Sequence, residues 1–194
     1  DIQGKALNWG ICADAAKVNF NDLMGAKPWK FVSNLPYAIT SISLRKALYA
    51  SNPPILLVAL IQKEVADRIL AQDKKEHMSL LALMSHLACK DIKIVHKVSP
   101  TSFYPPPKVD SAIIKMIPMS PKERQNKWGV DPENVMKIAK IGFSHPRKLL
   151  SRNVNIKADK WTKRAQELNL NIKARAEDLS VENWVALAKA QLHP

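Results

Sequence analysis

The longest apolar run in the chain, Ile55 to Ile61, has seven residues and follows the breaker Asn52-Pro53-Pro54. It is too short to span a membrane and is typical of a buried strand in a parallel sheet. Lys30 to Ser33 predicts an earlier strand, and Ser41 to Ala50 between the two has helical spacing. The apolar positions of that helix are Ile42, Leu44, Ala47 and Leu48. The order strand, helix, strand predicts a parallel α/β sheet.

The chain continues with helices at Lys63 to Ala71 and Met78 to Ala88, and a further short strand is expected near Gly10 to Asp14. Period-two alternation predicts a strand at Ile92 to Val98, and β-branched residues predict another at Val109 to Ile117. The proline-rich loop between them holds Phe103 and Tyr104 at a fixed place over the sheet edge.

Residues 118–130 carry prolines, charges and a glycine and are interpreted as a linker. From Asp131-Pro132 onward the pattern is helical, since an N-cap residue precedes a proline at the first helical position. We therefore expect two domains, residues 1–120 with the sheet and residues 121–194 with a small set of helices.

The strand Lys30 to Ser33 runs into Asn34-Leu35-Pro36-Tyr37. Proline cannot continue a central strand, so these groups stand at a carboxyl strand end, where open α/β sheets bind ligands. An amide oxygen and a backbone carbonyl could accept hydrogen bonds from the amino group of an aromatic base, and Tyr37 could stack on the base. The competing interpretation is a plain turn with Tyr37 packed in the core.

The formal net charge is +13, which points to nucleic acid, or with less support to an anionic membrane surface. Between His145 and Arg164 there are seven Lys or Arg and one acid, Asp159. A helix face that is merely exposed to solvent usually carries both positive and negative side chains. The excess of positive charge in this segment therefore favours contact with RNA or DNA over an ordinary solvent-exposed surface. Cys12 and Cys89 are isolated, which fits reduced thiols in a cytoplasmic protein, and no His or Cys spacing suits a metal.

Four blocks of the chain resemble, in order, the ribosomal RNA adenine N6,N6-dimethyltransferase family, and most closely its bacterial small-subunit branch, linked to kasugamycin sensitivity. They are Asn34-Leu-Pro-Tyr37, Gln62-Lys-Glu-Val-Ala-Asp-Arg68, Phe103-Tyr-Pro-Pro-Pro-Lys-Val-Asp-Ser-Ala112 and Phe143-Ser-His-Pro-Arg-Lys148. The resemblance implies a class I, Rossmann-like methyltransferase sheet followed by helices. It also implies S-adenosylmethionine as the methyl donor, the small ribosomal subunit RNA as the partner, and a monomer.

The resemblance assigns the catalytic site to Asn34, Leu35, Pro36, Tyr37 and Phe103. Asn34 and the Leu35 carbonyl would receive the amino group of the target adenine, while Tyr37 and Phe103 would stack on the base. Two residues would bind the methyl donor: Asp14, which would contact its adenine, and Asn34. The residues expected to bind RNA are Lys108, Arg147, Lys148, Arg152, Lys157, Lys160, Lys163 and Arg164.

One departure from the family concerns glycine. The chain has five glycines and no Gly-x-Gly, although the family opens with a glycine-rich loop after its first strand. We therefore expect an N-terminally truncated sheet in a fragment of a longer protein, or a cleaved form of one, with weak binding of the methyl donor by this chain alone. Smaller departures are Ala38 and His145-Pro146.

Three other functions compete with rRNA dimethylation. The first is a ribosome-assembly factor or transcription factor of the same fold that binds nucleic acid and needs no methyl transfer. The presence of Asn34, Tyr37 and Phe103 together argues against it, because a protein that only binds would not need all three. A DNA adenine methyltransferase would need a recognition domain for which the helical tail has little room. A large-subunit rRNA enzyme shares the tetrapeptide but is disfavoured by the block Pro105-Pro-Pro-Lys-Val-Asp-Ser111.

Overall fold

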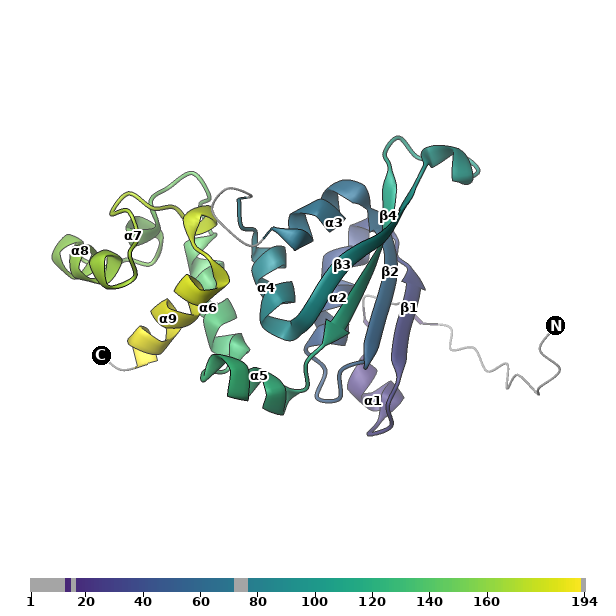
Figure 1. Ribbon diagram of the computed structural model, residues 1–194, viewed down its shortest axis with the longest axis horizontal. Coiled ribbons are helices and arrows are strands. Elements are labelled where there is room, and N and C mark those ends of the chain that lie inside the picture. The colour runs from purple at the N-terminus through teal and green to yellow at the C-terminus, as the bar shows by residue number, and fades with distance from the viewer. Residues whose placement is uncertain (1–12, 15–16, 72–76, 193–194) are drawn as a thin grey trace.

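The computed structural model describes residues 13–14, 17–71 and 77–192, and its centre is a four-stranded sheet with helices against one face (Figure 1). The first half of the chain forms α1 Phe20–Met24, β1 Lys30–Asn34, the 3₁₀ turn Tyr37–Ile39, α2 Thr40–Leu48, β2 Leu56–Gln62, α3 Lys63–Leu70 and α4 Leu80–Ala88. The second half forms β3 Cys89–Val98, the 3₁₀ turn Pro100–Ser102, β4 Ser111–Pro118, α5 Pro121–Trp128, α6 Pro132–Gly142, α7 Leu150–Asn153, α8 Ala158–Glu167, the 3₁₀ turn Ala176–Asp178 and α9 Val181–Leu192.

The strand order is β1-β2-β4-β3. β1 pairs with β2 in parallel, as the strand, helix, strand order predicts, with Asn34 opposite Leu60. β4 pairs antiparallel with both β2 and β3, so the sheet is mixed and β3 and β4 form the predicted strand pair. The strand expected near Gly10 to Asp14 lies largely outside the described residues, and Ala13 and Asp14 themselves belong to no strand.

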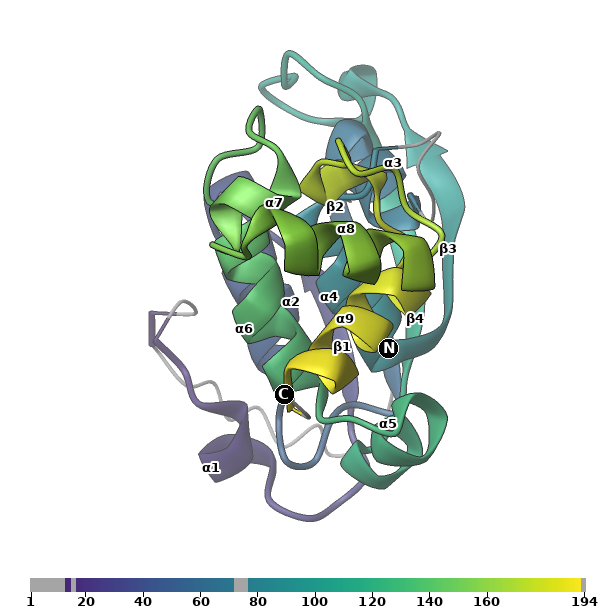
Figure 2. The same ribbon diagram turned by 90° about the vertical axis from the view of Figure 1, so that its left-hand side faces the viewer.

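The helices lie on one side of the sheet, in two layers. α3 and α4 contact the sheet and α2 packs against α4, while α6 to α9 lie beyond them, as the two views in Figures 1 and 2 agree. On the covered face, Leu57, Ala59 and Ile61 of β2 are fully buried, whereas on the other face Val32 of β1 is 73% exposed. The prediction that Ile55 to Ile61 forms a buried strand is therefore correct for one face of β2. On the other face, the alternate residues of β2 are only half-buried.

The prediction of a linker at residues 118–130 is wrong, because this segment contains α5. Ser120 and Glu123 form a capping box: the Ser120 hydroxyl accepts from the Glu123 N–H, and the Glu123 carboxylate accepts from the Ser120 N–H. Gly129 ends the helix with φ of 62°, a left-handed conformation that glycine adopts without steric cost.

α5 joins the sheet side to the C-terminal helices through two buried side chains. Arg124 donates to the carbonyls of Leu48 and Met119, and its guanidinium lies 5.1 Å from the centre of the Tyr49 ring. The Trp128 indole N–H donates to the Leu87 carbonyl. Arg124 and Trp128 thus satisfy carbonyls at the C-terminal ends of α2 and α4, which are otherwise unpaired in a helix.

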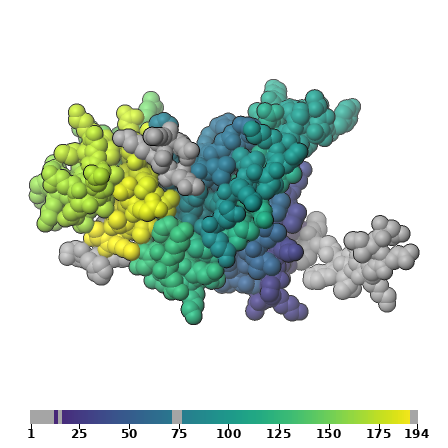
Figure 3. Space-filling view, in the orientation of Figure 1, coloured from purple at the N-terminus to yellow at the C-terminus, as the bar shows by residue number. Residues whose placement is uncertain are grey.

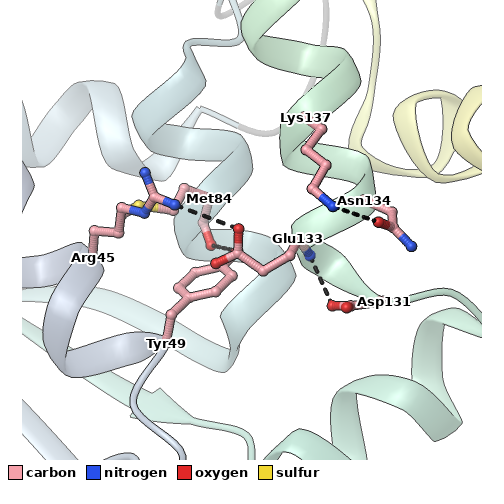
Figure 4. A network of polar contacts seen from close by, with 7 residues as sticks. All are labelled: Arg45, Tyr49, Met84, Asp131, Glu133, Asn134 and Lys137. Atoms are coloured by element: carbon pink, nitrogen blue, oxygen red, sulfur yellow. Dashed lines mark hydrogen bonds and ion pairs between the residues drawn. The ribbon is translucent and has the colours of Figure 1, made fainter.

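A second group of contacts joins α2 and α4 to α6 (Figure 4). Arg45 forms an ion pair with Glu133 at 3.4 Å, and the Tyr49 hydroxyl donates to the Met84 carbonyl at 3.1 Å. Burial is the main cause that raises the pKa of Tyr49 above its ordinary value. The hydrophobic core runs continuously through these contacts, and the division into domains at residue 120 stays a prediction.

The C-terminal helices pack around two fully buried tryptophans, Trp161 and Trp184. Gly142 lies so close to Trp184 that an added Cβ would be 2.5 Å from the indole ring. At the start of α9, the Ser180 N–H donates to the Asn183 side-chain oxygen and the Asn183 N–H donates to the Ser180 hydroxyl. Among the described residues, no helix has the length and apolar character needed to cross a membrane.

Candidate target-base site

The turn after β1 leaves two hydrogen-bond acceptors unused. The buried Leu35 donates its N–H to the Leu60 carbonyl at 3.2 Å, which holds the turn against β2. The Pro36 carbonyl accepts from the Ile39 N–H and from the Thr40 hydroxyl, at the start of α2. In the described part of the chain, neither the exposed Asn34 side chain nor the Leu35 carbonyl has a hydrogen-bond partner.

Tyr37 lies at the surface, with 38% of its area exposed. Its hydroxyl is 3.0 Å from the hydroxyl of Ser111, the fully buried first residue of β4. The interpretation of Tyr37 as a core residue is therefore wrong. The contact leaves the ring at the surface and fixes its position.

Asn34, Leu35, Pro36 and Tyr37 line one wall of a shallow hollow of about 340 Å³. Leu60 lies at the carboxyl half of β2, and the facing wall is the loop between β3 and β4, which projects beyond the sheet in Figures 1 and 3. That loop contributes Phe103, Tyr104, Pro105 and Pro107. Phe103 is half-buried, and Tyr104 is completely exposed.

The structure thus brings together all five residues that the sequence assigns to catalysis. Asp14 is not part of the hollow; it forms an ion pair with Lys17 at 3.8 Å. The residue pattern does not mark Leu60 or Ser111 as site residues, although Ser111 stands in the quoted proline block, and it places Tyr104 over the sheet edge without assigning it to catalysis. Leu60 lies beside Asn34 through the pairing of β1 with β2, and Ser111 lies at the start of β4 through the pairing of β2 with β4. The residue pattern gives neither pairing.

The hollow has the chemistry of an acceptor site for an amino group on a flat ring. Two oxygen acceptors, from Asn34 and Leu35, stand beside aromatic rings from opposite walls. None of the described residues that line it carries a charge. Such a site can receive two N–H donors and an aromatic face, as expected for an unstacked base.

Lys108 lies on the other side of the same loop, in a second hollow of about 550 Å³ with Lys63 and Asp67. Lys63 and Asp67 form an ion pair at 2.6 Å, and this hydrogen bond raises the pKa of Lys63. Lys108 itself is exposed and forms no ion pair with any described residue.

The other cations predicted to bind RNA lie in the C-terminal helices and the loops between them. On α8, Trp161 and Ala165 face the core. Arg164 forms an ion pair with Glu167 at 3.2 Å. Six are exposed and have no acidic partner within the described ranges: Arg147, Lys148, Arg152, Lys157, Lys160 and Lys163.

Comparison with known proteins finds ribosomal RNA methyltransferases both among family models and among individual relatives. The family described as ribosomal RNA adenine dimethylase matches residues 2–191. A relative from Nostoc sp., named ribosomal RNA small subunit methyltransferase A, is 36% identical over 84% of this chain and 60% of its own length. A protein of the same name from Crocosphaera subtropica is 39% identical over 96% of this chain and 68% of its own length. The chain thus spans about 60% of the length of the first of these relatives.

Two solved structures show the same fold. A dimethyladenosine transferase from Plasmodium falciparum superposes with a TM-score of 0.66 at 24% identity, over 86% of this chain and 67% of that one. The 23S rRNA methyltransferase ErmE superposes with a TM-score of 0.65 at 20% identity, over 92% of this chain and 70% of that one. The mixed sheet with its helices is therefore Rossmann-like, as the resemblance predicts.

Proposed function

The chain belongs to the ribosomal RNA adenine dimethylase family, and we propose that it takes part in the N6,N6-dimethylation of adenines in small-subunit (16S) ribosomal RNA during ribosome assembly. The observation that supports this function is the hollow after β1. It combines the Asn34 amide and the Leu35 carbonyl, both without a partner among the described residues, with Tyr37 and Phe103 on opposite walls.

The two acceptors act on the reacting nitrogen. The lone pair of an adenine amino group is delocalised into the ring, which makes the nitrogen a poor nucleophile. Two N–H donors bound by Asn34 and Leu35 favour a more tetrahedral nitrogen whose lone pair is directed out of the ring plane. Orientation of this kind can account for a large part of the lowering of the activation barrier. The nitrogen loses its proton only after the bond to the methyl group has made it cationic.

The aromatic walls hold the base once it has left the RNA stack. Tyr37 is fixed by Ser111, and Phe103 is half-buried at the base of the proline loop. A base between two aromatic rings also excludes water from the reacting nitrogen. We assign Pro36 a structural role, since its carbonyl starts the helix that follows the turn.

S-adenosylmethionine would supply the methyl group in this reaction. The residues that line the hollow fit the methyl acceptor: they are apolar, aromatic or amide-bearing and include no carboxylate. Of the two residues that the resemblance assigns to the methyl donor, Asn34 lines the hollow and Asp14 does not. Asn34 therefore remains the better supported of the two assignments.

The exposed cations would hold the RNA backbone. Lys108 stands beside the target hollow, and the six exposed cations without an acidic partner among the described residues run from Arg147 to Lys163. Phosphate contacts carry affinity without reading sequence, so these residues would bind the subunit and leave base selection to the hollow. Arg164 is a weaker candidate because Glu167 already neutralises it.

Asn34 provides the decisive test. We expect Asn34→Ala, made in the full-length protein, to abolish methyl transfer from S-adenosylmethionine to unmethylated small subunits while RNA affinity changes little, because the side chain acts on the reacting nitrogen. Asn34→Asp keeps an acceptor oxygen of the same shape and should retain more activity than Asn34→Ala. Single-turnover methyl transfer and RNA binding are measured on the same preparations. A near-normal rate for Asn34→Ala would contradict the proposed function and favour a binding-only factor of the same fold.

A further inference from the structure

The segment from Ser144 to Leu149 connects α6 to α7 and has fixed ends. At its start, Phe143 stacks on the buried Trp184, with ring centres 5.6 Å apart. At its end, Leu150 is fully buried and donates its N–H to the Ala174 carbonyl at 2.9 Å. The intervening residues are exposed or half-buried, so their conformation depends on hydrogen bonds rather than on the core.

Asn153 supplies hydrogen bonds to this segment from α7. Its side-chain Nδ2 donates to the Gly142 carbonyl at 2.6 Å and to the His145 carbonyl at 3.0 Å. The His145 carbonyl also accepts from the Lys148 N–H at 2.9 Å, which closes a turn across Pro146 and Arg147. One amide thus links the end of α6 to the turn that carries Arg147 and Lys148.

The orientation of the Asn153 amide follows from its partners. Both neighbours are carbonyl oxygens, so a flipped amide would oppose oxygen to oxygen. The Oδ1 atom is buried and has no hydrogen-bond partner in the described part of the chain. A buried acceptor without a partner carries a free-energy cost, and the two donated bonds offset it.

We propose that Asn153 is a positioning residue for RNA: it holds the turn His145 to Lys148 so that Arg147 and Lys148 meet neighbouring phosphates of the RNA backbone together. This inference rests on the proposed RNA contact of the basic segment. The turn places the two cations side by side on a closed loop, and neither has an acidic partner among the described residues. A preorganised pair of cations loses less conformational freedom on binding than two cations on an open loop.

The test is a double-mutant cycle on binding to a small-subunit rRNA transcript. Its four proteins are the parent, Asn153→Ala, the pair Arg147→Ala with Lys148→Ala, and the combination of all three. We expect Asn153→Ala to weaken binding roughly tenfold, a usual size for coupled neighbours, and to have little further effect once both cations are removed. It should also flatten the slope of log affinity against log salt, because fewer phosphates would be neutralised in the complex.

Matched controls separate positioning from folding and from charge. Asn155 lies two residues further on, is exposed and makes no side-chain hydrogen bond with a described residue. Its φ of 51° is tolerated by glycine, so Asn155→Gly is the neutral control and should bind as the parent does. Asn153→Asp and Asn155→Asp add the same charge to the same segment, and we expect the first to weaken binding much more. Thermal unfolding of each variant reports the fold, and Asn153→Ser, which keeps one donor, replaces Asn153→Ala if the latter does not fold.

The outcomes are distinguishable. An Asn153 effect of the same size with and without the two cations would overturn the positioning role. Unchanged binding by the Arg147 and Lys148 variant would instead contradict the RNA contact itself, and with it this part of the proposed function. Methyl transfer measured at saturating RNA should remain near normal in Asn153→Ala, because the residue lies outside the target hollow.

Discussion

The Tyr37 hydroxyl lies 3.0 Å from the Ser111 hydroxyl, so the turn after β1 is bonded to the first residue of β4. We expect Tyr37→Phe to keep the aromatic wall and to lower the free energy of unfolding by about 1 kcal/mol, the usual value of one neutral hydrogen bond. Tyr37→Ala should in addition slow methyl transfer strongly. Chemical unfolding and single-turnover rates separate the two effects. Equal rates for both variants would show that the ring does not hold the base.

Phe103 forms part of the opposite wall. Phe103→Ala should lose about 1–3 kcal/mol of stacking on the target base, whereas Phe103→Tyr and Phe103→Trp should retain much of the activity. The measurement is the single-turnover rate as a function of RNA concentration. If Phe103→Ala were as active as the parent, Phe103 would be a loop-packing residue.

The basic segment can be tested through salt. Neutralising Arg147, Lys148 and Arg152 together should weaken binding to the small subunit and reduce the slope of log affinity against log salt by about one unit for each phosphate that is no longer bound. Arg164→Ala is a suitable control, since this residue is already paired with Glu167 and should matter less. An unchanged slope in the triple variant would indicate that the three charges form a solvated surface.

His86 on α4 should make stability depend on pH. Burial lowers the pKa of His86 from its ordinary value of 6.5, against the opposing effect of carbonyls at the end of α3. The unfolded chain therefore binds the proton more readily than the folded chain. We expect stability to be unaffected by this group above about pH 6.5 and to fall as the pH drops from there towards the lower pKa of the folded state.

The check is the free energy of unfolding between neutral and acid pH. His86→Gln should remove this contribution to the slope. A slope that is the same in His86→Gln and in the parent would show that His86 is not protonated on unfolding.

The sequence predicts regular elements well where apolar periodicity is strong. The predicted bounds of β1 and β2 agree within a residue or two with those observed, and the pair β3 and β4 lies around its proline loop as predicted. α5 is not predicted because its surface is highly charged and resembles a linker. Its signal is present in Ser120-Pro121-Lys122-Glu123, the pattern of a capping box, which the charged run obscures.

Packing explains the other differences. Ile42 has the spacing of a core residue in α2 but is 42% exposed. The pattern shows that a residue is apolar, but neighbouring elements decide whether it is covered. The motifs mark the five catalytic candidates directly, whereas Leu60 joins the site through the parallel pairing of β1 with β2. Asp14 stays a prediction taken from the resemblance.

The connection between Tyr37 and Ser111 also makes the target hollow sensitive to strand pairing. In the observed register Gln62 lies opposite Ser111, and this pairing turns the Ser111 hydroxyl towards Tyr37. Because side chains alternate across a sheet, a slip of β4 by one residue would turn that position to the opposite face and carry the Phe103 loop with it. A misregistered chain would therefore keep its secondary structure and lose the proposed target hollow. Methyl-transfer activity would then report correct folding of the sheet more sharply than circular dichroism could.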